Sequence, residues 1–192
     1  MSDLYFQDEV FEKEAFEAKD AAKGNEYDGC RFTNCDFSKT DLSNTLFSDC
    51  EFHSCDFSMA KFSKTAFRNA LFRECKMLGV HFEDCSPFGM ILRFEHCILH
   101  HASFFRVNLQ QTRFENTSLI ETDFTEANLS QACFENCDLK DAVFAATNLE
   151  KADLRSACHY RIDPVRNKIR KAKFSLEGVA GLLASFDVYV EP

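Results

Sequence analysis

The chain has 192 residues, the length of a single domain, and a formal net charge of −9 at pH 7. It contains no apolar run long enough to span a membrane, and residues 1–24 are acidic where a signal peptide would be basic and then apolar. These features argue against a membrane-bound or secreted protein and predict a cytoplasmic one with no membrane partner.

Phenylalanine spacing becomes regular close to the N-terminus, where Phe6, Phe11 and Phe16 are five residues apart. The next stretch, 17–26, is polar and breaks the spacing, which indicates a loop or one helical turn. Because a repeat protein needs an atypical end to cover its core, we expect residues 1–26 to form an N-terminal cap and a first imperfect coil.

Residues 27–157 repeat a five-residue unit with a large apolar residue at its centre and a small residue two positions earlier. Five residues advance an α-helix by about 500°, which leaves no apolar stripe, and on a flat strand they would alternate faces. The chain must therefore turn a corner at every repeat, as in a β-solenoid. The phenylalanine core centres of the most regular part are Phe94, Phe104, Phe114, Phe124, Phe134 and Phe144.

The number of sides in each coil follows from which residues are in register. Three sides would mix phenylalanine with leucine in every stack, whereas four sides place every fourth repeat in register and keep each stack pure. Cysteines agree with four sides, because Cys30 and Cys50 are separated by four repeats, as are Cys35 and Cys55 and then Cys55 and Cys75. The sequence therefore predicts an all-β fold, a quadrilateral parallel β-helix.

Ten cysteines raise the question of disulfides or a metal site. No CxxC pair is followed by a second Cys or His pair, and His96, His100 and His101 fall on outward positions of neighbouring sides that point apart. We therefore expect no metal site, no cofactor and no disulfide framework. Eight cysteines occupy the small inward position and are expected to pack as small apolar groups: Cys30, Cys35, Cys50, Cys55, Cys75, Cys85, Cys97 and Cys137.

The five-residue period fails once, near residues 85–91. Phe82 and Phe94 are separated by two repeats and two extra residues. Counting Pro87 as a degenerate centre restores the stacks on both sides, so the sequence predicts a two-residue bulge and no domain boundary. The remaining bulge residues, Phe88, Met90 and Ile91, are expected to fold back and fill a gap; the alternative is an exposed partner-binding knob.

Glu95, Glu115 and Glu135 each follow the phenylalanine of one stack. Because four repeats separate each from the next, they should form an outward ladder of like charges, here called the acidic ladder, although opposed like charges destabilise neighbouring strands. The acidic ladder is either a partner-binding surface or a set of solvated carboxylates relieved by Arg73 and Arg155, which flank the stack.

Charge is unevenly distributed along the chain. Residues 1–157 hold 27 acidic and 16 basic side chains, and residues 158–192 hold four and six. The repeat region therefore carries about half the charge of duplex DNA of similar length, which has one charge per ~1.7 Å. This density makes electrostatic mimicry of a duplex plausible.

Residues 158–192 depart from the repeat and are expected to form a capping and dimerisation module. After an extended turn and a basic run, Ser175 can cap a helix, although Gly178 and Gly181 weaken it. A short strand is expected at 188–190. The helix and strand hold more apolar surface than one coil needs, which predicts a homodimer. The apolar residues of this dimer seam are Leu176, Val179, Leu182, Leu183 and Phe186.

Units such as Ala-Asn-Leu-Ser-Gln at 127–131 and Ala-Asp-Leu-Arg-Ser at 152–156 resemble those of the pentapeptide-repeat family, over residues 27–157. That resemblance implies a right-handed β-helix, the usual hand of parallel crossovers. Through Ile162, Asp163 and Pro164 and the helix containing Leu182 and Leu183, the chain is similar to the topoisomerase-protecting McbG, Qnr and MfpA proteins.

The similarity implies a non-catalytic DNA mimic that binds DNA gyrase or topoisomerase IV in place of duplex DNA and protects it from quinolone or microcin-type inhibitors, without binding nucleic acid itself. One feature departs from the pattern. The longer loops that support quinolone protection in Qnr proteins of Gram-negative bacteria are missing, since this chain has only the bulge near Pro87.

Catalysis is not expected. The sequence contains no G-x-S-x-G, Walker or Rossmann motif, and a shaft filled by side chains leaves no cleft. We therefore assign no catalytic residues. The alternative to topoisomerase binding is a structural protein–protein interaction scaffold with no topoisomerase partner.

Overall fold

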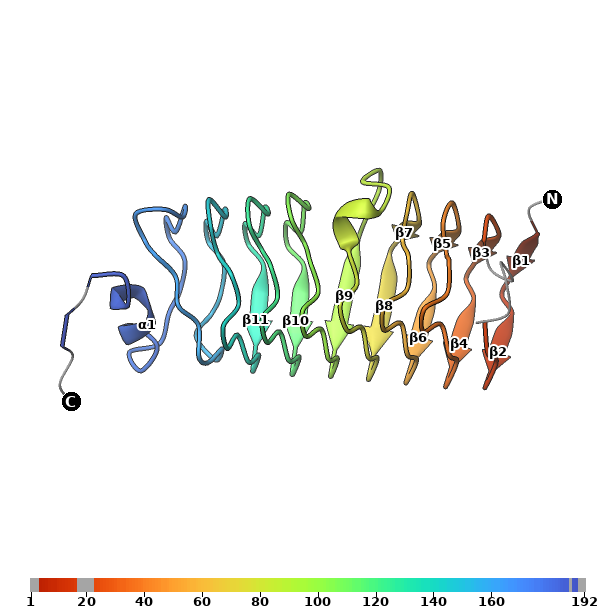
Figure 1. Ribbon diagram of the computed structural model, residues 1–192, viewed down its shortest axis with the longest axis horizontal. Helices are drawn as coiled ribbons and strands as arrows, with labels where there is room; N and C mark the ends of the chain where they lie inside the picture. Colours follow the sequence, from red (N-terminus) through yellow and green to blue (C-terminus); the bar gives the residue numbers. More distant parts are fainter. Residues whose placement is uncertain (1–3, 17–22, 187, 190–192) are drawn as a thin grey trace.

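The computed structural model describes residues 4–16, 23–186 and 188–189. Over these residues the chain winds into an elongated β-solenoid whose coils stack along its long axis (Figure 1). Each coil has four short faces, one for each five-residue repeat. Among the described residues, no helix has the length and apolar character needed to cross a lipid bilayer.

Two faces carry parallel sheets. The four-stranded sheet has the order β1-β3-β5-β7 and the seven-stranded sheet has the order β11-β10-β9-β8-β6-β4-β2. The first sheet consists of β1 (Tyr5–Gln7), β3 (Glu26–Asp28), β5 (Leu46–Ser48) and β7 (Ala66–Arg68). The second consists of β2 (Val10–Glu12), β4 (Arg31–Thr33), β6 (Glu51–His53), β8 (Ala70–Arg73), β9 (Leu92–Glu95), β10 (Arg113–Glu115) and β11 (Cys133–Glu135).

Strand register confirms the quadrilateral parallel β-helix. Phe94 pairs with Phe114, and Phe114 pairs with Phe134. Each partner lies four repeats further along the chain, as a coil of four faces requires. The pairing of Phe72 with Phe94 spans two more positions, because the two extra residues of the bulge enter that coil. The two remaining faces are joined by isolated parallel bridges, such as that from Ser103 to Asp123.

Phenylalanine side chains fill the shaft. Phe94, Phe104 and Phe114 are fully buried, as are Phe124 and Phe134, and Phe144 is 7% exposed. Rings in one stack lie nearly parallel, with centroids 5.2 Å apart for Phe94 and Phe114, and rings of facing stacks meet edge to face, at 76° for Phe94 and Phe104. Both arrangements are favourable for aromatic quadrupoles, so the core is continuous along the rod.

A residue with positive φ forms the corner after almost every repeat. The residue two positions after the centre takes φ of +58° at Lys64, +64° at Gln111 and +54° at Ala146. This left-handed conformation turns the chain onto the next face. It costs about 1–2 kcal/mol for most residues, and the amide it exposes bonds to the next coil, as Gln111 N does to Ser130 O at 3.0 Å.

The first coil begins within the predicted N-terminal segment. Strands β1 and β2 pair with β3 and β4, and Ala15 bridges to Asp36. Phe16 is buried, and Phe6 and Phe11 pack against the core. Residues 5–16 therefore supply three sides of a coil. Most of the predicted loop at 17–26 lies outside the described residues.

The solenoid continues beyond the boundary predicted at residue 157. Lys168 bridges to Asn148 and Lys173 bridges to Asp153, in each case to a position four repeats earlier. Ile169 and Phe174 pack against the core at the corresponding centres. The basic run therefore forms two further faces of a coil, because Ile169 and Phe174 keep the central position of the repeat and Asn167 and Ala172 keep the position two residues earlier.

The long helix predicted after Ser175 is wrong. The only helical residues in this part of the described chain are α1 (Ala180–Leu183), which follows a series of turns. A Cβ atom at Gly178 or Gly181 would collide with Tyr160, so both glycines allow the segment to fold tightly over that ring. Ser175 Oγ still accepts the Gly178 amide at 3.1 Å. The predicted strand is absent at residues 188–189, and residue 190 lies outside the described residues.

Candidate protein-interaction surfaces

The acidic ladder lies on β9, β10 and β11. Glu95 pairs in register with Glu115, and Glu115 with Glu135, with all three side chains half-buried. Arg73 Nη2 lies 2.7 Å from the Glu95 carboxylate, and Arg113 Nη2 lies 3.3 Å from that of Glu135. The three glutamates therefore lie in register on successive coils, as predicted, but two of the three carboxylates are paired with arginine.

Arg155 does not relieve the acidic ladder as predicted. Its guanidinium pairs with Asp153, with Nη2 2.7 Å from Oδ2. Glu115 instead accepts a hydrogen bond from Asn116 at 3.4 Å and has no ion pair with the described residues. The local relief therefore comes from Arg73 and Arg113, each reaching a carboxylate on the next coil.

Negative charge is concentrated towards the N-terminal end of the chain. Residues 1–50 hold 12 acidic and five basic side chains, whereas residues 51–157, which contain the acidic ladder, hold 15 and 11. The seven-stranded face shows this mixture directly, since Arg31 and Glu51 also pair across coils at 3.1 Å. The exterior is therefore a patterned mixture of charges with a net negative sign.

The bulge projects beyond the line of the neighbouring corners, next to the short 3₁₀ helix η1 (Phe82–Asp84) (Figure 1). Phe88 is 79% exposed and Ile91 is 58% exposed, and Pro87 is exposed as well. Met90 alone packs against the core. The expectation that these residues fold back is therefore wrong for Phe88 and Ile91. Two extra residues lengthen the loop, and one side chain suffices to fill the gap.

An apolar hollow of about 420 Å³ lies beside the bulge and is lined by Pro87, Met90 and Phe105 among others. Arg106 covers one side of this hollow, with its guanidinium carbon 4.6 Å from the centroid of the Phe105 ring. The bulge therefore combines exposed apolar side chains with an adjacent concave surface.

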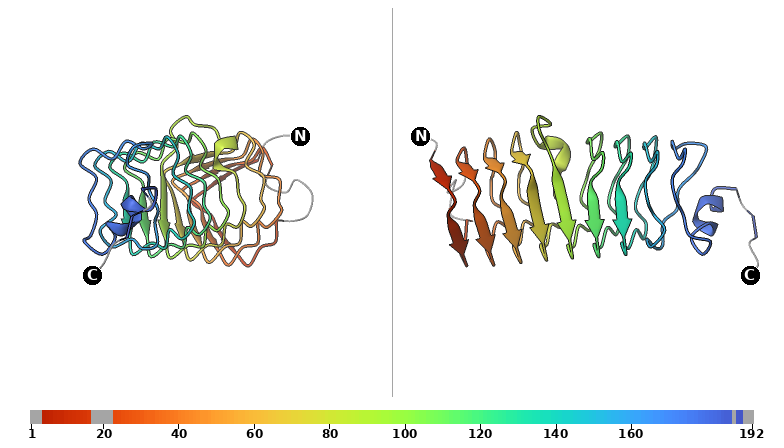
Figure 2. Two further views of the ribbon diagram at one scale, coloured as in Figure 1. Left: turned by 60° about the vertical axis from the view of Figure 1, so that its left-hand side comes forward. Right: turned by 180° about the vertical axis from the view of Figure 1, so that it is seen from behind.

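The predicted dimer seam has two different environments. Leu182 packs against the core and Leu183 is half-buried, so this part of α1 covers the last coil. Leu176 is 86% exposed, Phe186 is 47% exposed and Val179 is 38% exposed. Figure 2 shows α1 at the end of the solenoid. The segment thus covers the core and still presents apolar side chains outward.

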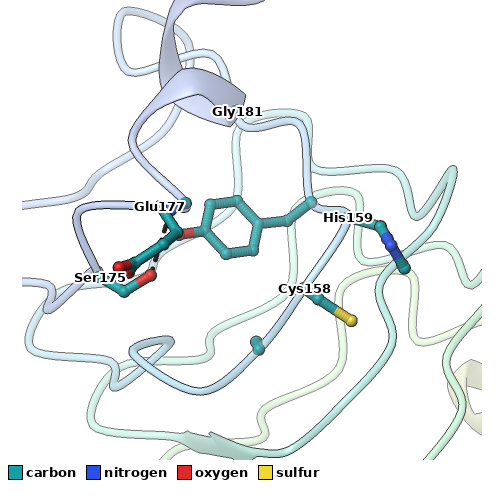
Figure 3. Close-up of a pocket in the computed structure, with 8 residues that line it drawn as sticks. Cys158, His159, Ser175, Glu177 and Gly181 are labelled. Carbon is teal, nitrogen blue, oxygen red and sulfur yellow. Dashed lines mark hydrogen bonds between the residues drawn. The ribbon is translucent and has the colours of Figure 1, made fainter. Parts of the chain in front are cut away.

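A hollow of about 290 Å³ separates the last coil from the α1 segment. Figure 3 shows Ser175 and Glu177 on one side of it, while the side chains of Cys158 and His159 point away from them on the other side. The hollow is lined by residues 157–160 and by Ser175, Glu177, Gly178 and Gly181, in keeping with a joint between two packed segments.

Two deeply buried cysteines, Cys50 and Cys137, pack as neutral thiols. Burial raises the pKa of Cys50 and of Cys137 to about 12, so both stay protonated at neutral pH. All ten cysteines are free, and Cys133 and Cys158 are the two outside the core. All eight inward cysteines are buried in the core, as the sequence predicts for small packing residues.

Outward histidines next to one another in sequence do not converge. His100 Nε2 lies 2.7 Å from Ser118 Oγ, whereas His101 Nδ1 faces Glu121 at 3.2 Å. One cluster that the sequence analysis missed comprises Asp138, Cys158 and His159. The sequence could have indicated this cluster, because Cys158 follows Asp138 by four repeats. That spacing places two residues side by side on successive coils.

Comparison with known proteins gives the family. A model described as a pentapeptide repeat region matches residues 26–87, and one described as pentapeptide repeats in eight copies matches residues 102–141 and 122–158. The chain belongs to the pentapeptide-repeat family. Together the matches cover most of the solenoid on both sides of the bulge. No curated protein matches the chain.

Solved structures of this family match nearly end to end. A trypsin-treated variant of QnrB1, a plasmid-mediated fluoroquinolone resistance protein, aligns with a TM-score of 0.65 and 21% identity over 99% of this chain and 100% of that chain. Full-length QnrB1 aligns with a TM-score of 0.55 and 20% identity over 96% of this chain and 100% of that one. HetL, from the cyanobacterium Nostoc sp. strain PCC 7120, aligns with a TM-score of 0.45 and 14% identity over 91% and 88%. At about 20% identity, the property that the two QnrB1 structures share with this chain is the solenoid fold.

Proposed function

We propose that this pentapeptide-repeat protein is a non-catalytic cytoplasmic protein that binds DNA gyrase or topoisomerase IV as a mimic of duplex DNA and protects the enzyme from quinolone or microcin-type inhibitors. One observation carries the proposal: the chain forms a filled rod of the same extent as QnrB1, whose described role is fluoroquinolone resistance. A rod of this kind acts through its outer surface.

The acidic ladder supports a contact that duplex DNA would otherwise make. Its carboxylates recur on successive coils, at the ~4.8 Å spacing of paired strands, and each strand of duplex DNA carries one phosphate per ~3.4 Å of helix axis. The net charge of −9 has the sign that a DNA-binding groove attracts. Ladder residues Glu95, Glu115 and Glu135 are the proposed contacts.

The bulge supplies an apolar contact to the same partner. Phe88 and Ile91 are exposed side chains beside a hollow, and clusters of this type are typical of protein-interaction sites. Exposed Leu176, Val179 and Phe186 form the remaining part of the proposed dimer seam, which joins two rods at their C-terminal ends.

Supercoiling by purified gyrase, titrated with this protein with and without a quinolone, tests the proposal. We expect inhibition or drug protection by the native protein and loss of the effect when Glu95, Glu115 and Glu135 are replaced by lysine. Replacing Glu121, Asp141 and Glu150 by lysine is the matched control, because it changes the net charge equally on other faces. Equal activity of both triple variants would show that the acidic ladder is not the contact.

A second candidate is a structural scaffold with no topoisomerase partner. Pairing of Arg73 with Glu95 and of Arg113 with Glu135 favours it, because paired charges stabilise neighbouring coils and attract a partner less strongly. Titrations that leave both gyrase and topoisomerase IV unchanged, with and without drug, would support the scaffold and overturn the topoisomerase proposal.

A further inference from the structure

Three side chains with the donor atoms of a zinc site meet near the C-terminal end of the solenoid. Asp138, Cys158 and His159 each offer one ligand atom, and these atoms lie within 4.8 Å of one another. Carboxylate oxygen, thiolate sulfur and imidazole nitrogen are the usual ligands of zinc in proteins. From this juxtaposition we propose that the protein binds one Zn²⁺ ion through Asp138, Cys158 and His159.

Strand register places two of the ligands side by side. Asp138 bridges in parallel to Cys158 on the next coil, and the Cys158 amide donates to Cys137 O at 2.9 Å. Successive coils are ~4.8 Å apart, so both side chains leave neighbouring positions of one face. The backbone alone therefore fixes the separation of these two ligands before any ion binds.

A break in the repeat supplies the third ligand. The five-residue period, continued from Leu149 and Leu154, would place His159 at an inward centre. The structure gives His159 a φ of +58°, leaves its side chain 62% exposed and buries Tyr160 instead. The imidazole therefore reaches back to the previous coil, where its Nδ1 lies 2.8 Å from Asp138 Oδ1.

The surroundings suit a three-ligand site with an open fourth position. Cys158 and His159 are exposed and Asp138 is half-buried, so water can complete a tetrahedron. Binding replaces the contact between His159 and Asp138 with two bonds to the ion, and the Cys158 thiol releases its proton to solvent. An ion at this position ties the coil containing Asp138 to the segment that begins at Cys158 and carries Tyr160 under α1.

A second histidine–carboxylate pair provides an internal control. His101 has a φ of +56° and faces Glu121 at 3.2 Å, so it matches His159 in backbone and partner. No cysteine joins this pair in a cluster of metal-ligating groups among the described residues. Zinc bound by any exposed histidine beside a carboxylate would therefore occupy both places, whereas the proposed site needs Cys158.

Titration of the full-length, tag-free reduced protein with Zn²⁺ in a calorimeter tests the site. We expect one ion per chain, and at least roughly tenfold weaker binding in Cys158→Ser, His159→Asn and Asp138→Asn, since even outer groups of zinc sites are worth about that much. Asparagine suits the left-handed position of His159. Cys133→Ser and His101→Asn should bind as the native protein does. Unchanged binding by Cys158→Ser, or no saturable binding by the native protein, would overturn the proposal.

Cobalt spectroscopy decides the question without relying on any variant. The native protein loaded with Co²⁺ should show thiolate-to-cobalt charge transfer in the near ultraviolet and the visible bands of a tetrahedral ion. A cobalt complex without the thiolate band would exclude Cys158 as a ligand and overturn the site. Neither readout depends on topoisomerase binding, so the two proposals fail or succeed separately.

Discussion

At the residue scale, Phe114 is enclosed by rings above and below it in its own stack and by Phe104 and Phe124 across the shaft. Phe114 stacks on Phe94 at 5.2 Å and on Phe134 at 5.0 Å. Phe114→Ala should therefore lower the free energy of unfolding by about 3–5 kcal/mol, because it leaves a cavity between neighbouring rings. Urea denaturation followed by circular dichroism measures the change.

The control for Phe114→Ala is Gln110→Ala, at an exposed position of the same coil, which should change the unfolding free energy by less than about 0.5 kcal/mol. Gln111 is less suitable, because its side-chain amide donates a hydrogen bond to Gln131 Oε1 at 3.4 Å. Similar losses for Phe114→Ala and Gln110→Ala would contradict the assignment of inward and outward positions.

The left-handed corners lead to a prediction of opposite sign. Ala146 is exposed and has a φ of +54°, a conformation that costs an L-residue about 1–2 kcal/mol but costs glycine almost nothing. Ala146→Gly should therefore stabilise the protein by roughly 0.5–1 kcal/mol, despite the added entropy of the unfolded chain. Thermal denaturation measures it.

The matched control is Ala145→Gly. Ala145 itself does not have a positive φ, so glycine relieves no strain there, and its greater freedom in the unfolded chain should destabilise the protein by about 0.5–1 kcal/mol. A loss of stability in both variants would show that the corner carries no strain.

At the element scale, what the sequence predicts depends on whether local period and packing agree. The repeat predicts the four faces because every fifth side chain must be buried. It also continues through Ile169 and Phe174, but the sequence does not predict this because lysine and arginine surround these two apolar residues. The prediction of a long C-terminal helix is wrong because Gly178 and Gly181 allow the chain to pack closely against Tyr160. This contact is distant in sequence, so no local pattern predicts it. The five-residue period also cannot predict that Phe88 is exposed, because the period does not say whether an inserted residue points inward or outward.

An ion pair within one coil, between Arg155 and Asp153, also sets the response to acid. Arg155 holds Asp153 through two bonds, Nε to Oδ1 at 2.9 Å and Nη2 to Oδ2 at 2.7 Å, and these lower the Asp153 pKa to about 2. A depressed pKa stabilises the fold above the unfolded value, ~3.9, and that contribution disappears as the pH falls towards 2. Arg155→Gln should raise the Asp153 pKa towards 3.8, so this contribution to stability is smaller and is lost at a higher pH.

A carboxyl-detected NMR titration of Asp153 measures this shift. Arg166→Gln is the control, since Arg166 contacts Asp163 and not Asp153, and it should leave the Asp153 titration unchanged. An Asp153 pKa that stays near 2 in Arg155→Gln would assign its depression to the other neighbours, chiefly Lys173 at 3.6 Å.

At the scale of the whole molecule, the rod has two different ends. Acidic side chains predominate in residues 1–50, whereas residues 158–192 hold six basic and four acidic side chains and place exposed apolar groups around α1. Apolar groups at one end favour association of two copies through that end, because a closed two-fold contact buries the same surface on both. In such a dimer the two acidic N-terminal ends would lie far apart, which reduces the electrostatic repulsion between them.

This arrangement predicts a homodimer that depends on the α1 segment. Sedimentation velocity should show the native protein as a dimer and the double variant Leu176→Glu, Phe186→Glu as a monomer, because both side chains are exposed and charges would be desolvated in the interface. Val165→Glu is the matched control, a 78% exposed valine in the turn before the final coil, and it should remain dimeric. A monomeric native protein, or a double variant that still sediments as a dimer, would remove the C-terminal seam from the proposal.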